Sequence, residues 1–109
     1  MQTKKLDDTI TVSHQIAIED VQTIRDQGFT LLMCNRPDGE DPGQPAWGEV
    51  KAAAEAAGLK TAFLPVSSRD EAIAMKEPFQ VEMASADGPV FAYCRTGTRC
   101  EILWTLSKN

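Results

Sequence analysis

Four short segments of the chain have the hydrophobic patterns of β-strands. The segment TITVS (residues 9–13) is β-branched and alternating, which predicts a first strand. FTLLMC (29–34) and PVFAY (89–93) are continuously apolar, as in strands buried on both faces of a parallel sheet. LKTAFLPV (59–66) lies between these two and is predicted as the third strand in chain order.

The segments between the first three strands carry helical signals. Ile18, Val21 and Ile24 have the spacing of one helix face within residues 18–28, a segment that ends in a glycine. The alanine-rich segment 46–58 has high helix propensity and also ends in a glycine. We therefore expect one helix in each segment.

The second half of the chain continues the alternation. Pro78 suits the first turn of a helix over residues 78–88, where a missing N–H group costs little. Residues 67–77, just before it, are ambiguous between a helical turn and a loop. A last helix is predicted over residues 98–109. Three of its apolar side chains are expected to face the core: Ile102, Leu103 and Leu106.

Strands and helices thus alternate along the whole chain, and this order predicts the fold class. We expect an α/β fold with a mainly parallel, four-stranded sheet flanked by helices. At 109 residues, the chain is expected to form a single domain over residues 1–109. Ligands of such sheets bind beyond the carboxyl ends of the strands. Three segments leave strands at that edge: residues 35–45, 66–77 and 94–99.

Composition narrows the range of partners. The net charge of −5 argues against nucleic acid or an anionic membrane, but not against a small anion in a local pocket. No apolar run reaches transmembrane length, and the N-terminus lacks the apolar region of a signal peptide. The three cysteines form no CxxC pair or Cys/His cluster, so no metal or other cofactor is expected. We expect a reducing, cytoplasmic setting, and the sequence leaves the oligomeric state open.

The segment CRTGTR (residues 94–99) carries the strongest chemical signal. Cys94 follows a predicted buried strand, and the unpaired N–H groups of the next helix would converge beside it. The same field stabilises a thiolate, and thiols so placed have pKa values of about 3.5 to 7.5. Gly97 permits a tight turn, and Arg99 can grip two oxygens of a tetrahedral oxyanion. These parts favour nucleophilic attack on phosphorus or sulfur.

The residues between Cys94 and Arg99 are expected to surround the anion. They are Arg95, Thr96, Gly97 and Thr98. Arg36, on the loop after the second predicted strand, is a candidate for a further contact with the anion. The expected ligand is a small anionic substrate, either a phosphate ester or a sulfane sulfur donor.

Four segments resemble the phosphatase-like domain of beta-lactamase hydrolase-like proteins, a nonclassical bacterial branch of the tyrosine and dual-specificity phosphatase fold. They are VSHQI followed by EDV, NRPDGEDPGQP, LPV, and YCRTGTR. The resemblance covers nearly the whole chain and implies a cysteine phosphatase-like fold. It also implies that Cys94 is the nucleophile and that Arg99 binds the phosphate.

The spacing within the loop departs from that of tyrosine phosphatases, which place five residues between the cysteine and the arginine. Here only four intervene, and the residue at the longer spacing is Cys100. Loops of the pattern C-R-x-G-x-R are similar to those of rhodanese sulfurtransferases, in which the cysteine carries a persulfide. The predicted function is a cysteine-dependent phosphatase. The alternatives are a sulfurtransferase and a non-enzymatic anion-binding module.

The resemblance implies two supporting residues. Related phosphatases carry a general-acid aspartate on the loop where this chain has Asp70. Asp38, Glu40 and Asp41, on the other loop at the same edge, are interpreted as turn or surface carboxylates. Some dual-specificity phosphatases have a second cysteine that pairs with the nucleophile under oxidation. The segment LLMCN resembles theirs, so Cys34 is the candidate resolving cysteine. The rival is Cys100, which is expected to point away because the chain must curl around the anion site between the two sulfurs.

Overall fold

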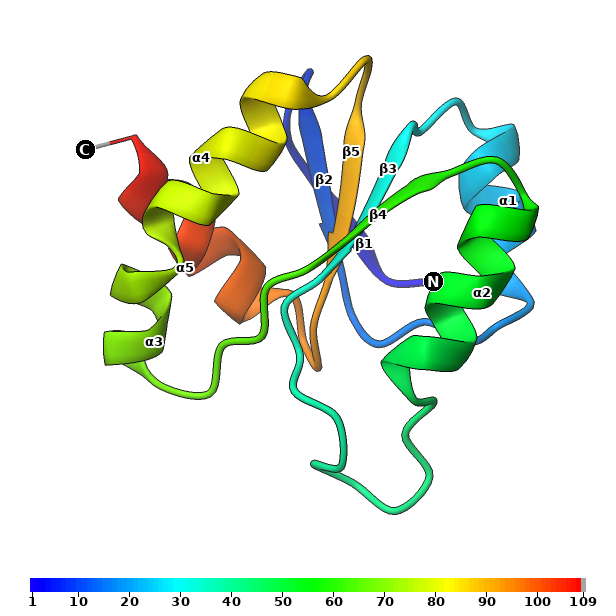
Figure 1. Cartoon of the computed structure of the whole chain (residues 1–109), viewed down its shortest axis with the longest axis horizontal. Helices are drawn as coiled ribbons and strands as arrows, with labels where there is room; N and C mark the ends of the chain where they lie inside the picture. Colours follow the sequence, from blue (N-terminus) through cyan, green and yellow to red (C-terminus); the bar gives the residue numbers. More distant parts are fainter. Residues whose placement is uncertain (109) are drawn as a thin grey trace.

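Residues 1–108, the part of the chain described by this computed structural model, are built around one five-stranded sheet (Figure 1). The strands are β1 (Thr3–Asp7), β2 (Ile10–Ser13), β3 (Leu31–Cys34), β4 (Lys60–Phe63) and β5 (Val90–Tyr93). They lie in the order β1-β2-β5-β3-β4. Only β1 and β2 pair antiparallel within this range; the other neighbours are parallel. The prediction of an α/β fold with a mainly parallel sheet is confirmed.

Helices cover both faces of the sheet. They are α1 (Asp20–Asp26), α2 (Trp47–Ala56), α3 (Arg69–Ala74), α4 (Lys76–Ser85) and α5 (Thr98–Ser107). Figure 1 shows α1 and α2 on one side of the sheet and the other three helices on the opposite side. Among residues 1–108, no helix combines the length and apolar character needed to cross a membrane.

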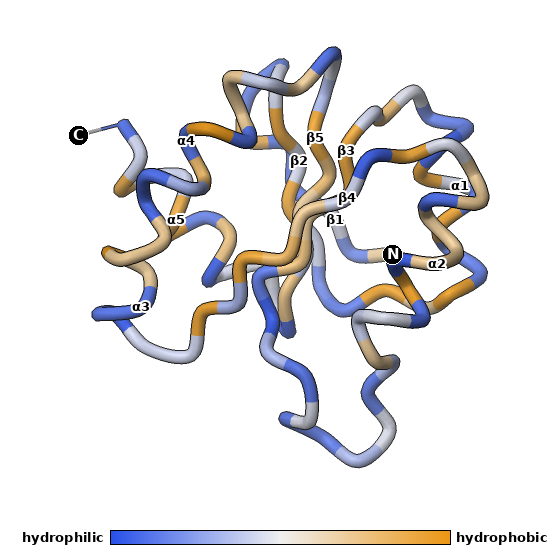
Figure 2. The backbone as a smooth tube through the Cα atoms, in the orientation of Figure 1, coloured by the Kyte–Doolittle hydropathy of each residue, from blue (hydrophilic) through white to orange (hydrophobic). Residues whose placement is uncertain are grey.

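The central strands divide the core into two layers. Every residue of β3 and β5 is buried, and their side chains alternate between the two faces. On one face, Met33 and Ala92 pack with Leu103 of α5. On the other face, Cys34 and Tyr93 pack with the apolar residues of α1 and α2. In Figure 2 the apolar residues accordingly gather on the central strands, whereas the loop after β3 is largely polar.

The sequence pattern missed β1, which is why it predicted four strands. The segment TKKLD is exposed over its first three residues and lies at the edge of the sheet. Lysines are favoured on edge strands because they discourage pairing with another chain, and they also remove the apolar alternation that predicts a strand. The central strands β3 and β5 were predicted because every residue of both is buried and apolar.

The ambiguous segment 67–77 forms α3 and the start of α4. Ser68 explains the start of α3, because its side chain accepts a hydrogen bond from the Glu71 N–H group at 3.2 Å. At the other end of the chain, α1 begins at Asp20 and leaves Ile18 outside the helix and 36% exposed. Ile18 therefore does not share the buried helix face that its spacing predicted.

The prediction that three apolar side chains of α5 face the core is wrong for Ile102. Leu103 is fully buried and Leu106 packs partly against the core, whereas Ile102 is 45% exposed. Successive residues of an α-helix point about 100° apart, so Ile102 and Leu103 cannot both face the sheet.

Leu103→Ala and Ile102→Ala form a matched pair that tests the orientation of α5. We expect Leu103→Ala to lower the free energy of unfolding by about 3 kcal/mol, because it opens a cavity in the core. Ile102→Ala should change the free energy of unfolding by less than about 1 kcal/mol, because that side chain is half exposed. Urea unfolding followed by circular dichroism measures both values. Equal losses would contradict this orientation.

Candidate active site

The loop from Cys94 to Gly97 joins β5 to α5 at the carboxyl edge of the sheet. Gly97 is the N-cap of α5 and has a φ of 84°, a left-handed conformation that L side chains rarely adopt. Its backbone also packs closely, because a Cβ at this position would lie 3.6 Å from the Ser13 carbonyl. The turn that the sequence predicted at Gly97 therefore forms beside the end of β2.

The sulfur of Cys94 takes the place of a helix cap. Gly97 has no side chain to accept the free amides of α5, but its own N–H group donates to Cys94 Sγ at 3.1 Å. The Cys100 thiol and the backbone N–H groups of Thr96, Arg99 and Cys100 also lie near enough to stabilise negative charge on this sulfur. These donors, the Cys100 thiol foremost, lower the pKa of Cys94 from 9.0 to about 5 although burial raises it. Cys94 is therefore a thiolate at neutral pH.

Arg99 is anchored along one edge of its guanidinium group and free along the other. Nη1 donates to the Val66 carbonyl at 2.8 Å and to Glu40 Oε2 at 2.9 Å, and Nη2 donates to Glu40 Oε1 at 2.8 Å. No other hydrogen bond within residues 1–108 uses this guanidinium. Nε–H and one Nη2–H remain, and together they form an edge suited to two oxygens of a tetrahedral anion.

Glu40 binds two arginines at once. Besides its contacts with Arg99, its Oε1 accepts a hydrogen bond from Arg36 Nε at 2.9 Å. Hydrogen bonds from Arg99 and then Arg36 lower the pKa of Glu40 from 4.5 to about 2, against the opposing effect of burial. The carboxylate is therefore ionised throughout the physiological range and cannot serve as a general acid.

Arg36 is a support of the site and does not offer the free anion contact that the sequence suggested. It is only 3% exposed, and its other two nitrogens donate to Gln15 Oε1 at 2.9 Å and to Asp41 Oδ2 at 2.6 Å. Every nitrogen of this guanidinium thus has a protein partner. Arg36 therefore holds the loop after β3 in position beside Arg99.

The other predicted anion-binding residues lie on the loop itself. Thr96 Oγ1 donates to Thr98 Oγ1 at 3.0 Å, which ties the two ends of the turn together. Arg95 points outward with 65% of its side chain exposed, and its Nε lies 3.8 Å from Asp41 Oδ2. The loop therefore has the Gly97 amide inside and an exposed positive charge at its rim.

The carboxylates that were considered as acids occupy different positions. Asp38 Oδ1 accepts a hydrogen bond from the Trp47 N–H group at 2.8 Å and so starts α2. Asp41 is paired with Arg36, as described above. Asp70 lies in the first turn of α3 and is exposed. Its helix follows the segment in which the Val66 carbonyl accepts a hydrogen bond from Arg99. Of the four carboxylates considered, Asp70 is the one that is not held by a hydrogen bond or an ion pair within residues 1–108.

Cys34 lies at the same sheet edge but on the opposite face from Cys94. It is in register with Tyr93, and both belong to the core layer under α1 and α2, whereas Cys94 belongs to the layer under α5. The Cys34 thiol donates to the Arg36 carbonyl at 3.3 Å. Burial raises the pKa of this thiol to about 11, so it is protonated and unreactive at neutral pH.

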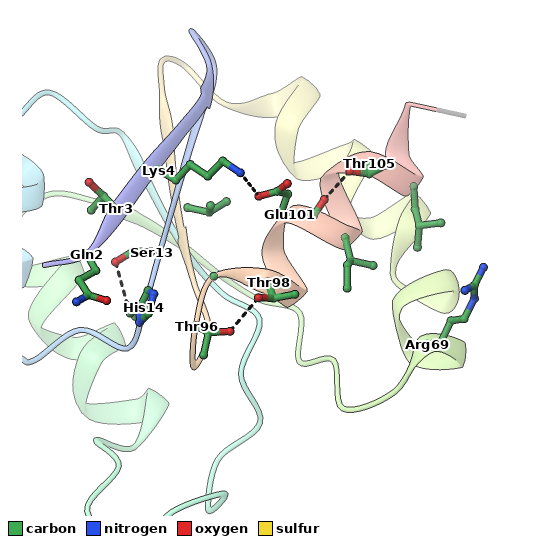
Figure 3. A pocket seen from close by; sticks show the side chains of 14 residues that line it. Gln2, Thr3, Lys4, Ser13, His14, Arg69, Thr96, Thr98, Glu101 and Thr105 are labelled. Carbon is green, nitrogen blue, oxygen red and sulfur yellow. Dashed lines mark hydrogen bonds and ion pairs between the residues drawn. The ribbon is translucent and has the colours of Figure 1, made fainter.

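A pocket of about 620 Å³ adjoins the loop between β1, β2 and α5 (Figure 3). Thr96 and Thr98 form one side of it, His14 lies at the end of β2, and the Lys4–Glu101 ion pair of 2.9 Å spans another side. Neither Cys94 nor Arg99 lines this pocket. The pocket therefore flanks the loop and does not contain the reactive sulfur.

Sequence reasoning missed two residues that shape the site, Glu40 and Cys100. Glu40 lies 59 positions from Arg99, so no spacing rule connects them. The sequence did contain a hint that Arg99 has such a partner, because a partly buried guanidinium needs hydrogen-bond acceptors for its five N–H groups. Cys100 was noted as the residue at the wrong spacing for an arginine and as a rival resolving cysteine that was expected to point away from Cys94.

A mainly parallel sheet whose central strand is followed by a cysteine at the N-terminus of the next helix is also the arrangement that the comparisons associate with phosphatase-like α/β domains. The chain belongs to the family described as "Beta-lactamase hydrolase-like protein, phosphatase-like domain", whose model matches residues 2–109. The resemblance noted in the sequence is confirmed.

Three comparisons illustrate this membership. A beta-lactamase hydrolase-like protein from Agrobacterium fabrum is 41% identical over 108 residues, which is 99% of this chain. A structure described as a candidate phosphatase from Neisseria meningitidis is 40% identical, with a TM-score of 0.83 over 92% of this chain and 71% of the other. TpbA from P. aeruginosa in complex with phosphotyrosine has a TM-score of 0.59 over 88% of this chain and 54% of the other at 14% identity, which shows the shared fold alone. The chain spans only 25% of the length of its Agrobacterium relative.

The anchoring role of Glu40 predicts how stability depends on pH. We expect Glu40→Gln to lower the free energy of unfolding at neutral pH by about 2 kcal/mol, because two arginines lose their shared carboxylate. The pKa of Glu40 is depressed from 4.5 to about 2. The advantage of the wild type is therefore complete above pH 4.5 and is lost as the pH falls through 2. Urea unfolding across this range measures it.

Glu55→Gln is the matched control, since Glu55 is an exposed glutamate of α2. Its effect on the free energy of unfolding should be within about 0.5 kcal/mol at every pH. A gap between wild type and Glu40→Gln that does not change between pH 4.5 and 2 would contradict the ion-paired carboxylate.

Proposed function

We propose that the chain is a cysteine-dependent hydrolase of a phosphate monoester. The observation that carries the proposal is the Cys94 thiolate at the N-terminus of α5, next to an arginine with one free edge. These groups supply a nucleophile and a clamp for the oxygens of phosphate. Membership in a phosphatase-like family and the phosphotyrosine complex of the structural neighbour TpbA support the choice of substrate class.

The reaction has two displacement steps at phosphorus. In the first step, Cys94 Sγ forms a bond to phosphorus while the bond to the ester oxygen breaks, and the leaving oxygen takes a proton. In the second step, water attacks the thiophosphate, the S–P bond breaks, and inorganic phosphate leaves. The second step returns the electron pair to sulfur and restores the thiolate.

The loop and Arg99 stabilise the charge on the phosphoryl oxygens. Amides of the segment from Arg95 to Thr98 and the free Nε–H and Nη2–H groups of Arg99 are the donors. Cys94 has no exposed surface, so a phosphoryl group reaches the sulfur only when the loop around it opens. The same enclosure keeps bulk water from the thiolate and strengthens its interactions.

Asp70 is the proposed proton donor for the leaving oxygen. Glu40 is excluded because its pKa lies near 2, and Asp38 and Asp41 are tied to a helix start and an arginine. Asp70 is exposed at the start of α3, a helix that contacts α5. The mechanism also needs free thiols, which a reducing compartment such as the cytoplasm maintains.

The spacing of the loop favours a second candidate function, sulfur transfer. Only four residues separate Cys94 from Arg99, and a tight loop suits a persulfide. With thiosulfate as donor, Cys94 would bind the outer sulfur as the S–S bond of thiosulfate breaks and sulfite leaves. Cyanide would then take that sulfur as thiocyanate and restore the thiolate. A non-enzymatic anion-binding module is the remaining alternative, because no hydrogen bond within residues 1–108 orients the proposed acid, Asp70, toward the loop.

Hydrolysis of an aryl phosphate tests the proposed function. We expect turnover that is abolished in Cys94→Ser and reduced at least about 100-fold in Arg99→Lys, because lysine cannot offer two parallel donors. Asp70→Asn should lower kcat for a phosphate ester with a poor leaving group more than for an aryl phosphate. Release of inorganic phosphate measures all three effects.

The alternatives give different results in the same assay. Thiocyanate formation from thiosulfate and cyanide without any phosphate release would favour sulfur transfer. Phosphate-dependent stabilisation against heat, lost in Arg99→Ala but without turnover, would favour a binding module. Phosphate release that survives Cys94→Ser would contradict every mechanism through this sulfur.

A further inference from the structure

We propose that Asn35 is a positioning residue of this site: its buried carboxamide fixes the chain where it leaves β4, so that the Val66 carbonyl can anchor Arg99. The inference rests on the proposed function only in taking Arg99 as the group that binds the anion. It assigns a task to a buried polar side chain that the proposed mechanism does not use.

Asn35 directly follows β3 and joins the ends of its two neighbouring strands. Its N–H group donates to the carbonyl of Tyr93, the last residue of β5, at 2.8 Å. Its carbonyl accepts a hydrogen bond from the Val66 N–H group at 3.0 Å, and its side-chain Nδ2 donates to the Leu64 carbonyl at 2.9 Å. Asn35 therefore connects the strand that leads to the nucleophile with the segment that leads to Arg99.

The side-chain bond takes the place of a bond that the backbone does not make. The Leu64 N–H group donates to the Cys34 carbonyl at 2.9 Å, as in a regular parallel ladder. The regular continuation would bring the N–H group of Arg36 to the Leu64 carbonyl. Within residues 1–108 that carbonyl accepts Asn35 Nδ2 instead, and the next residue, Pro65, has no N–H group to offer. The path of the chain after β4 therefore depends on the carboxamide.

This path determines where the Val66 carbonyl lies. Val66 is buried, its N–H group is held by Asn35, and its carbonyl accepts a hydrogen bond from Arg99 Nη1 at 2.8 Å. Glu40 holds the same nitrogen, but it lies on the mostly exposed loop after β3. Val66 is therefore the anchor of Arg99 that is attached directly to the sheet, and Asn35 is the residue that attaches it.

Stability alone does not explain an asparagine at this position. The Asn35 side chain has no exposed surface, and its Oδ1 is the one buried side-chain nitrogen or oxygen without a hydrogen-bond partner within residues 1–108. A buried acceptor without a partner lowers stability. Leucine has a similar size and would remove this acceptor, although it would also leave the Leu64 carbonyl without its donor. These two effects oppose each other, so the benefit of asparagine lies in the position of Arg99.

The mobility of the Arg99 guanidinium tests the proposal without any ligand. Nitrogen-15 relaxation of the Arg99 Nε–H group, assigned with Arg99→Lys, reports motion on the picosecond to nanosecond timescale. We expect an order parameter near that of a rigid group, about 0.85, in the wild type and below about 0.6 in Asn35→Leu. Asn35→Ala is measured in the same way in case leucine prevents folding. Equal order parameters in the wild type and a folded Asn35 variant would overturn the proposal.

Thr30→Val is the matched control at the opposite edge of the sheet. Thr30 precedes β3 and bonds to the same two neighbours: its N–H group donates to the Pro89 carbonyl at 3.0 Å, and its carbonyl accepts a hydrogen bond from the Lys60 N–H group at 3.0 Å. Its Oγ1 also donates to the Pro89 carbonyl at 3.4 Å. We expect Thr30→Val to leave the Arg99 order parameter unchanged. A decrease as large as that of Asn35→Leu would indicate general loosening of the sheet and contradict the proposal.

Binding of inorganic phosphate tests whether Asn35 acts through Arg99. By titration calorimetry, we expect Asn35→Leu to weaken phosphate binding about 3- to 10-fold. In an Arg99→Lys background the same substitution should change the affinity by less than about twofold, because the anchored guanidinium is gone. An equal factor in both backgrounds would contradict a role through Arg99.

These measurements separate the proposal from the proposed function, because neither requires turnover. Phosphate binding without hydrolysis of an aryl phosphate would reject the phosphatase and leave the comparison of Asn35 variants intact. If the wild type binds no phosphate, the anion site itself is rejected, and the Arg99 order parameter still decides whether Asn35 positions the guanidinium.

Discussion

The start of α5 carries amide groups that no helix residue can satisfy, and the sulfur of Cys94 accepts the one at Gly97. This one interaction links the fold to the chemistry. An uncharged, buried sulfur would be a poor acceptor, so the arrangement favours the thiolate despite the cost of burying a charge. The left-handed Gly97 is what allows the chain to turn back over the sulfur and place those amides.

The position of this sulfur follows from the parallel sheet. β5 lies between β2 and β3, so the cysteine after it emerges at the sheet edge where the loops that follow β3 and β4 also leave the sheet. Those loops supply the carboxylate of Glu40 and the carbonyl of Val66, which fix one edge of Arg99. Arg36 in turn holds Glu40 from below. The free edge of Arg99 is therefore oriented by contacts from two other strands, not by its own helix alone.

The sequence predicted the parts of this arrangement that are local. Cys94, Gly97 and Arg99 lie within six consecutive residues, and buried strands with helices between them have clear patterns. Side-chain partners that are distant in the sequence could not be predicted, and Glu40 was therefore interpreted as a turn carboxylate. β1 was missed because an exposed edge strand need not be apolar. Ile102 was wrongly expected in the core because two adjacent apolar residues of a helix cannot both face the sheet.

The resolving cysteine shows the limit of a resemblance in the same way. The ending of β3 suggested Cys34, and the register does bring its backbone near Cys94. The alternation of side chains across the sheet, which depends on the register of one residue, then puts the two sulfurs on opposite faces. Cys100, and not Cys34, shares the core layer of Cys94, which only the three-dimensional arrangement shows.

Titration of the Cys94 thiol tests most directly whether the N-terminus of α5 holds a thiolate. The ultraviolet absorbance of thiolates, measured as wild type minus Cys94→Ser across a pH series, reports this group without requiring access to it. The pKa of Cys94 is lowered to about 5, so the difference should be complete at neutral pH and should disappear as the pH falls through about 5. A difference that appears only near the ordinary value of 9.0 would contradict the thiolate at the N-terminus of α5 and the mechanism built on it.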